Sequence, residues 1–197
     1  MAEHVFESRG SHSGHRARLD HYTGVAVVLH WLVALLILGS FVVGTYMVEL
    51  DLSPWKLKVY SWHKWTGVTI FLLVPLRLAW RVTHRPPGLP AAMPEWQRHA
   101  AAISHALLYL LMFAVPVSGW LMSSAAGFPV VYFGVFQLPD LVAKDKELFE
   151  LMKSVHYVLN KALLVLVLLH VVAALKHHFV DRDEVLRRMA PLLRTKG

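Results

Sequence analysis

The stretch VHYVLNKALLVLVLLHVVAALKHHF, residues 155–179, decides how the chain folds. A helix of this length, at about 1.5 Å per residue, crosses the roughly 30 Å hydrocarbon core of a bilayer. Two histidines interrupt the apolar run, His156 and His170, which are fourteen residues apart. Fourteen steps of about 100° end within about 40° of the starting direction and advance about 21 Å. One face of this predicted membrane helix therefore presents two imidazoles at two depths.

Three further apolar segments of similar length precede this one. The chain is 56% hydrophobic with a mean hydropathy of +0.46, and the apolar residues lie in runs rather than in scattered positions. Residues 128–141 are also apolar, but the run is short and contains Pro129 and Pro139, so we expect a loop at the membrane surface. The predicted fold is an all-α, integral membrane four-helix bundle with spans at 25–48, 62–80, 103–122 and 151–179.

The composition limits the kinds of redox centre that the chain can hold. The chain has no cysteine, which excludes disulfides, thiolate-bound iron–sulfur clusters and covalently attached haem. A redox centre must then use histidine or methionine, of which the chain has 13 and 7. The net charge of +7 is explained by membrane topology, and we expect no nucleic-acid partner.

The positive charges predict the orientation. Every arginine falls in the N-terminal tail, in or beside the link between the second and third spans, or in the C-terminal tail, whereas all lysines except Lys176 and Lys196 fall on the other side. More of the positive residues thus lie on the side of the two tails, and the side with more positive residues stays in the cytoplasm. Both termini are therefore predicted to be cytoplasmic. Residues 1–20 are polar and contain no apolar signal core, which predicts a disordered cytoplasmic tail, and residues 192–197 are predicted to be a C-terminal cytoplasmic tail. The irregularly spaced histidines of the first tail do not predict a metal site.

Histidines within the spans pair by depth. Ionisable or strongly polar side chains are costly in a membrane, so each one suggests a function. His63 lies at the depth of His156, and His30 lies at the depth of His170. Neutral imidazoles are good axial ligands, so the pattern predicts two haems. Zinc or copper fits poorly with two separate sites of two histidines each. His105 and His177 are alternative ligands at the depth of His170 or beyond it.

Several segments together resemble the bacterial cytochrome b561 family, which belongs to the group of di-haem cytochrome b subunits of formate dehydrogenases and nickel–iron hydrogenases. The resemblance covers about residues 22–191 and rests on LHW (29–31), WHKWTG (62–67), LRLAWR (76–81), HALLYLLMFAVPVSGWLM (105–122) and residues 155–179. It implies a di-haem domain over residues 21–191 with two b haems in the bundle core. His30 and His170 would hold the cytoplasmic haem, and His63 and His156 the periplasmic one.

The resemblance also implies an activity. Compact members of the family resemble superoxide oxidases of the bacterial inner membrane, which pass electrons from periplasmic superoxide to ubiquinone. Lys64, Lys153 and Lys161 would then attract the anion, although the Asn160–Lys161 pair departs from the family pattern. Three residues are predicted to contact a quinone or the haem propionates, namely His105, Arg77 and His177. For Arg77 the alternative is a positive residue that only fixes the topology. Two alternatives stay open, a membrane subunit that serves a redox partner and a histidine-rich carrier of metal or haem.

Overall fold

The computed structural model describes residues 21–90 and 92–190, and most of them are helical. The predicted tails at 1–20 and 192–197 lie outside the described residues. Four long helices are present, each long and apolar enough to cross a membrane, which confirms the predicted all-α membrane fold. The elements are α2 (Gly24–Glu49), α3 (Pro54–Thr83), α4 (Glu95–Ala125), β1 (Val131–Tyr132), β2 (Phe136–Gln137), α5 (Lys146–Phe179) and α6 (Val185–Met189).

The helices extend beyond the apolar runs because polar residues cap them. The hydroxyl of Ser53 accepts a hydrogen bond from the Lys56 backbone N–H at 3.2 Å, so α3 begins at Pro54 and not near residue 62. Asp145 caps α5 in the same way, by accepting from the Leu148 N–H at 3.0 Å. Lys56, which lies between the first two predicted spans, is therefore in the first turn of α3.

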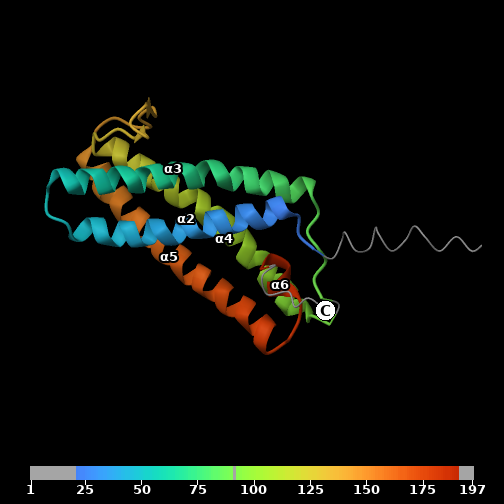
Figure 1. The fold of residues 1–197 in the computed structure, drawn as a ribbon. Coiled ribbons are helices and arrows are strands. Elements are labelled where there is room, and N and C mark those ends of the chain that lie inside the picture. Colours follow the sequence, from blue (N-terminus) through green and yellow to red (C-terminus); the bar gives the residue numbers. More distant parts are fainter. Residues whose placement is uncertain (1–20, 91, 191–197) are drawn as a thin grey trace, which may run out of the picture.

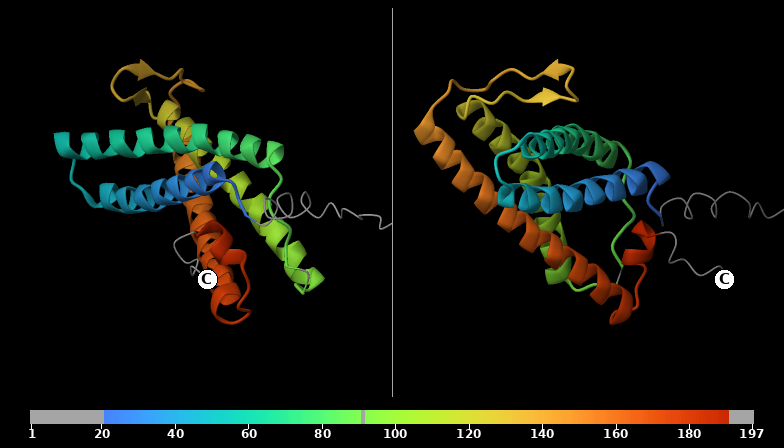
Figure 2. Two further views of the ribbon diagram at one scale, coloured as in Figure 1. Left: turned by 45° about the vertical axis from the view of Figure 1, so that its right-hand side comes forward. Right: turned by 60° about the vertical axis from the view of Figure 1, so that its left-hand side comes forward.

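Two helix pairs make up the bundle. Helix α2 runs beside α3, α4 runs beside α5, and the two pairs cross (Figures 1 and 2). We call the end that holds the start of α2 and the end of α5 the tail end, and the opposite end the hairpin end. Helix α6 folds back at the tail end, where the Trp31 indole N–H donates to the Met189 carbonyl at 2.7 Å. The first and last described helices thus meet at one end, as an even number of spans requires.

A band of apolar side chains fills the middle of the bundle. Large apolar residues also cover the outside, such as Val42 and Val172, which are 68% and 62% exposed. Such an exterior suits lipid and not water, so the chain is a multi-pass membrane protein in contact with the bilayer. The central band, which separates the two ends, consists of Val33, Ile37, Ile70, Val74, Leu108, Met112 and Leu163.

The short apolar segment after α4 forms an antiparallel β-hairpin. Strands β1 and β2 pair Val131 with Gln137, and the hairpin lies over the end of the bundle (Figure 2). The Trp65 indole N–H donates to the Val131 carbonyl at 2.6 Å, which ties the hairpin to α3. We expected a loop in this segment, and the backbone pairing of the two short strands gives part of it a regular structure.

Candidate functional site

Two pairs of histidines face each other across the bundle, one pair near each end. At the hairpin end the ring centroids of His63 on α3 and His156 on α5 are 6.4 Å apart, with the ring planes at 89°. At the tail end the rings of His30 on α2 and His170 on α5 are also 6.4 Å apart, at 59°. The structure thus brings together the same partners that the depth comparison predicted, with the apolar band between them.

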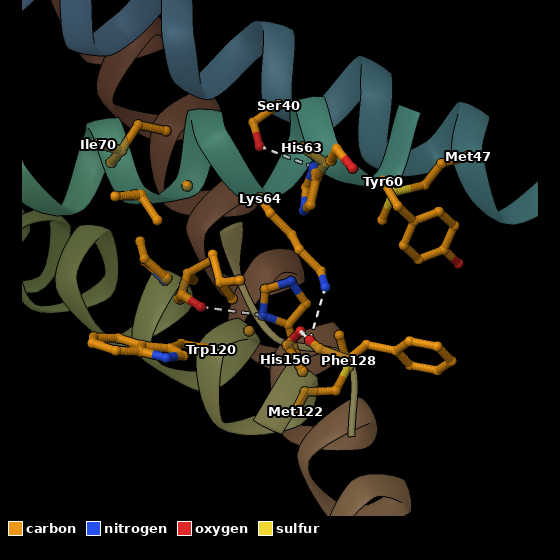
Figure 3. Close-up of a pocket in the computed structure, with 18 of the residues that line it drawn as sticks. Ser40, Met47, Tyr60, His63, Lys64, Ile70, Trp120, Met122, Phe128 and His156 are labelled. Carbon is orange, nitrogen blue, oxygen red and sulfur yellow. Dashed lines mark hydrogen bonds between the residues drawn. The ribbon is translucent and has the colours of Figure 1, made fainter. Parts of the chain in front are cut away.

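Hydrogen bonds determine which ring nitrogen is free in the hairpin-end pair. His156 Nδ1 lies 3.2 Å from the carbonyl oxygen of Val115 and 2.9 Å from the hydroxyl of Ser118. A carbonyl oxygen only accepts, so Nδ1 carries the proton and donates, and Nε2 keeps its lone pair. His63 Nδ1 contacts the hydroxyl of Ser40 at 3.2 Å (Figure 3). Both side chains are therefore oriented through Nδ1, as is usual for a histidine that binds metal through Nε2.

Two glycines let these rings lie against bare helix backbone. A methyl group at Gly119 on α4 would lie 3.1 Å from His156 Cε1, and one at Gly44 on α2 would lie 3.2 Å from His63 Cε1. Both distances are shorter than ordinary carbon–carbon contact. A larger residue at either position would therefore require the imidazole to shift by a few tenths of an ångström.

A large cavity opens at the hairpin end. Its volume is about 530 Å³, within the range of small-molecule and cofactor pockets, and both hairpin-end histidines line it (Figure 3). Most of the other lining residues are apolar, among them Ile70 and Phe71. The ammonium group of Lys64 also reaches into it and donates to the Phe128 carbonyl at 3.1 Å. Lys56 lines the cavity as well, so the cavity combines an apolar wall with two imidazoles and two lysines.

The tail-end group has different surroundings. Arg77 donates from Nη2 to Nδ1 of His30 at 2.9 Å, and its guanidinium lies over the ring of Tyr109 at 5.3 Å. Arginine only donates, so His30 Nδ1 accepts in this arrangement. A third histidine, His105 on α4, lies 5.5 Å from His170 between ring centroids. Three imidazoles and one guanidinium thus converge at the tail end.

Both pairs have the spacing that a shared iron atom needs. Two metal–nitrogen bonds of about 2.0 Å and two ring radii of about 1.1 Å would place the centroids about 6.2 Å apart. At the hairpin end the free Nε2 of His156 and the cavity also fit a haem. At the tail end His30 would bind iron through Nε2, which requires the proton to be on Nδ1. Nδ1 accepts a hydrogen bond from Arg77 in this structure, so the guanidinium would have to turn away.

Comparison with known proteins identifies the family of this chain. The profile of the prokaryotic cytochrome b561 family matches residues 21–191. The chain is a member of that family. Its relatives include "Cytochrome b561 homolog 2" of Escherichia coli (strain K12), which is 37% identical over 86% of this chain and 91% of that protein. "Probable superoxide oxidase CybB" of Yersinia pestis is 28% identical over 86% of this chain and 96% of that protein.

The predicted resemblance to cytochrome b561 is therefore confirmed. Members of this family are membrane proteins that bind haem b and transfer electrons, and this chain shares that general function. "Cytochrome b561 homolog 1" of Escherichia coli (strain K12) is a further relative, 27% identical over 88% of this chain and 98% of that protein.

The three lysines predicted to attract an anion occupy different surroundings in this cytochrome. Lys64 lines the hairpin-end cavity. Lys153 is exposed and pairs with Glu150 at 3.4 Å, and Lys161 lies over the ring of Tyr157 at 5.3 Å. Among the described residues the structure thus brings one of the three to the cavity. The roles of all three stay predictions.

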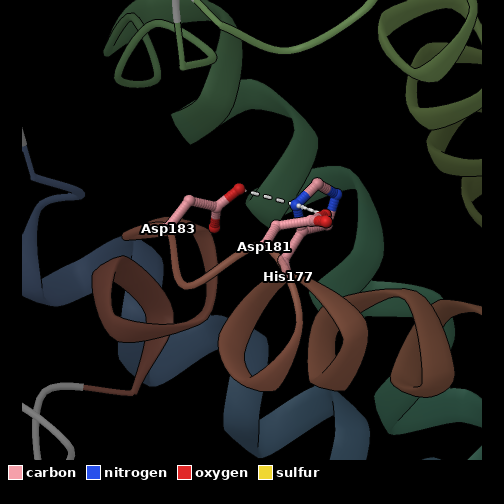
Figure 4. Close-up of side chains that lie close together, drawn as sticks. All are labelled: His177, Asp181 and Asp183. Carbon is pink, nitrogen blue, oxygen red and sulfur yellow. Dashed lines mark hydrogen bonds and ion pairs between the residues drawn. The ribbon is translucent and has the colours of Figure 1, made fainter.

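His177 takes part in a cluster of charged groups beyond the tail-end pair (Figure 4). Its Nδ1 lies 2.6 Å from an oxygen of Asp183 and 3.2 Å from one of Asp181. The ammonium group of Lys176 also bonds to Asp181, at 2.6 Å. These contacts close the turn between α5 and α6. The predicted contact of His177 with a quinone or a propionate stays a prediction.

Sequence reasoning did not identify the residues that support the histidines. Ser40, Ser118, Gly44 and Gly119 are ordinary small residues of apolar spans, and nothing in a single sequence separates them from packing positions. The need for a partner at Ser118 becomes visible only in the structure, where its hydroxyl is buried in a membrane helix. This side chain is 5% exposed.

Proposed function

We propose that this cytochrome holds two b haems, one between His63 and His156 and one between His30 and His170. The observation that carries the proposal is the equal centroid distance of 6.4 Å in the two pairs, which occur at the two ends of one bundle. A b haem with two imidazole ligands cycles between ferric and ferrous iron and carries one electron at a time. The chain's own part is to hold both groups in a low-dielectric interior at a fixed separation.

We propose further that the donor is superoxide and the acceptor is ubiquinone. In the net reaction two superoxide anions each lose one electron and become dioxygen, and one ubiquinone takes both electrons and two protons and becomes ubiquinol. The relative from Yersinia pestis, whose name specifies a superoxide oxidase, supports this assignment. Lys64, inside the hairpin-end cavity, supports an anionic donor at that end because a cation there raises the local concentration of an anion.

The distribution of basic residues supports a direction across the bacterial inner membrane. The described arginines lie in the tail-end half of the bundle, whereas Lys56, Lys64 and Lys153 lie in the hairpin-end half. The tail end is therefore assigned to the cytoplasm and the hairpin end to the periplasm. Superoxide reacts at the periplasmic end, and ubiquinone at the cytoplasmic end near His105 and Arg77.

A superoxide pulse tests the proposal. The purified oxidised protein is mixed with superoxide, and the b-type absorption bands are followed with and without a short-chain ubiquinone. We expect fast reduction of the bands and fast reoxidation by the quinone. Bands that ignore superoxide contradict the choice of donor, and reduced bands that persist in the presence of quinone contradict the choice of acceptor.

A second function has one observation in its favour. The tip of the β-hairpin exposes large apolar side chains, with Val135 89% and Phe136 63% exposed. Such a tip suits contact with a partner subunit that exchanges electrons with this cytochrome. Copurification of a dehydrogenase or hydrogenase subunit from native membranes, together with bands that ignore superoxide, is the result that this second function predicts.

A further inference from the structure

A small cavity lined by both charged and apolar side chains lies at the tail end, beside the histidine group. Arg77, Arg81, Tyr22 and Tyr109 line it, and Met189 of α6 closes one side. Its volume is about 20 Å³, which accommodates about one water molecule. Pockets for small organic ligands start near roughly 300 Å³. At least one wall must therefore move before a ring-sized molecule can enter.

The side chains around this cavity suit a quinone head group. A quinone offers two carbonyl oxygens, which gain negative charge as the ring accepts electrons. Two guanidinium groups and two phenol hydroxyls are hydrogen-bond donors for such oxygens, and the guanidinium charge stabilises the developing negative charge. Arg77 also donates to His30 at 2.9 Å, so a molecule bound at Arg77 is one residue away from the tail-end histidines.

Helix α6 is a short and only partly buried wall of this cavity. It has five residues, none of them buried, and a helix this short is marginal without packing. Two hydrogen bonds hold it to distant parts of the chain. The Trp31 indole N–H donates to the Met189 carbonyl at 2.7 Å, and Arg188 Nη1 donates to the Gly88 carbonyl at 2.5 Å. Segments with few buried contacts open most easily in a folded protein.

We propose that α6 is a movable cover over the quinone head-group site, and that the Trp31–Met189 hydrogen bond is its latch. The inference rests on the proposed choice of ubiquinone as electron acceptor. When the latch opens, Met189 leaves the cavity wall and the ring reaches Arg77 and Tyr109. When it closes, α6 shields the site from water. The latch thus limits how fast quinone reoxidises the protein, and it has no effect on how fast the protein is reduced from the hairpin end.

The first test loosens the latch. Trp31→Phe keeps an aromatic ring and removes the N–H that Met189 accepts. The matched control is Trp65→Phe, which removes an indole N–H that donates to the Val131 carbonyl at 2.6 Å at the opposite end. Each variant is fully reduced, mixed with short-chain ubiquinone, and followed by stopped-flow absorbance. Trp31→Phe should reoxidise about 2- to 10-fold faster at low quinone concentration, the range that the loss of one hydrogen bond allows, and Trp65→Phe should match the parent protein.

The second test locks the cover. The natural chain has no cysteine, so the double variant Trp31→Cys/Met189→Cys can be joined specifically with a short bis-maleimide. We expect the joined protein to keep its haem spectrum and its reduction by superoxide, while quinone reoxidises it at least about 10-fold more slowly. Each single cysteine variant, treated with the same reagent, controls for the substitutions.

The outcomes separate the two proposals. If quinone reoxidises the joined protein as fast as the single variants and Trp31→Phe has no effect, α6 is not the cover, and ubiquinone stays the acceptor. If quinone does not reoxidise the parent protein, ubiquinone is not the acceptor, and the role of α6 is overturned with it.

Discussion

The two histidine groups of this cytochrome differ in what their Nδ1 atoms contact. At the hairpin end Nδ1 of His156 donates to a carbonyl, two glycines make room for the rings, and a cavity of about 530 Å³ lies between them. At the tail end Nδ1 of His30 accepts from Arg77, and a third histidine stands beside His170. The contacts at the hairpin end fix the two imidazoles for one bound haem. The tail end also contains the guanidinium of Arg77, which would have to leave His30 when a haem binds. Under the proposed function, the hairpin end receives the electron and the tail end passes it to ubiquinone.

Removal of one ligand at a time should produce the largest effect. His156→Ala should abolish the hairpin-end haem and leave the tail-end haem, and His170→Ala should do the reverse, because the apolar band separates the two sites. The haem content per chain, measured by pyridine haemochrome, should fall from two to one in each variant. Two haems per chain in either variant would show that the pairs are assigned wrongly. Loss of both haems in both variants would show that the sites do not load independently.

A methyl group beside the hairpin-end ligand tests how rigid that site is. Gly119→Ala places a carbon 3.1 Å from His156 Cε1 in the present arrangement, so the ring must shift, whereas metal–ligand distances tolerate only about 0.2 Å. We expect at least about half of the molecules to lose the hairpin-end haem and none to lose the tail-end one. Gly39→Ala makes the same change in a helix with nothing within 4 Å, and it should leave both haems. Equal haem loss in the two variants would mean that only helix stability had changed.

Replacement of the tail-end charge should shift one redox potential and not the other. Arg77→Gln removes a cation beside His30, and a nearby cation favours the ferrous form. We expect the midpoint potential of the tail-end haem to fall by roughly 60 mV, which corresponds to about 1.4 kcal/mol for one electron, with no change at the hairpin end. A potentiometric titration measures both. Arg85→Gln, at an exposed position beyond α3, is the matched control. A shift of both potentials, or the same shift in the control, would contradict a local role for Arg77.

Neutralisation of single lysines should give the smallest effect. Lys64→Gln should slow reduction by superoxide about 3-fold and weaken its dependence on ionic strength, because Lys64 lines the cavity. Lys153→Gln should change the rate less, since that side chain is exposed and already paired with Glu150. Stopped-flow absorbance at two salt concentrations measures both rates. A larger effect of Lys153→Gln would locate the anion's approach on the outer face of α5.

The apolar runs alone predict the four spans, and the depths of the histidines within these spans predict which of them face each other. Those features depend on local periodicity, which a single sequence contains. The position of Arg77 against His30 depends instead on how α2 and α3 align, and the contact between Trp31 and Met189 depends on a turn far along the chain. Helix ends were missed for a simpler reason. Caps such as Ser53 and Asp145 extend helices through polar residues that hydropathy assigns to links.

The haem-to-chain ratio of the purified protein, combined with the electron paramagnetic resonance spectrum of its oxidised form, tests the central claim most directly. Two facing histidine pairs predict two haems per chain, both low-spin because each iron has two imidazole ligands. One haem per chain, or a high-spin signal from a haem with one open position, would contradict the assignment of one haem to each pair.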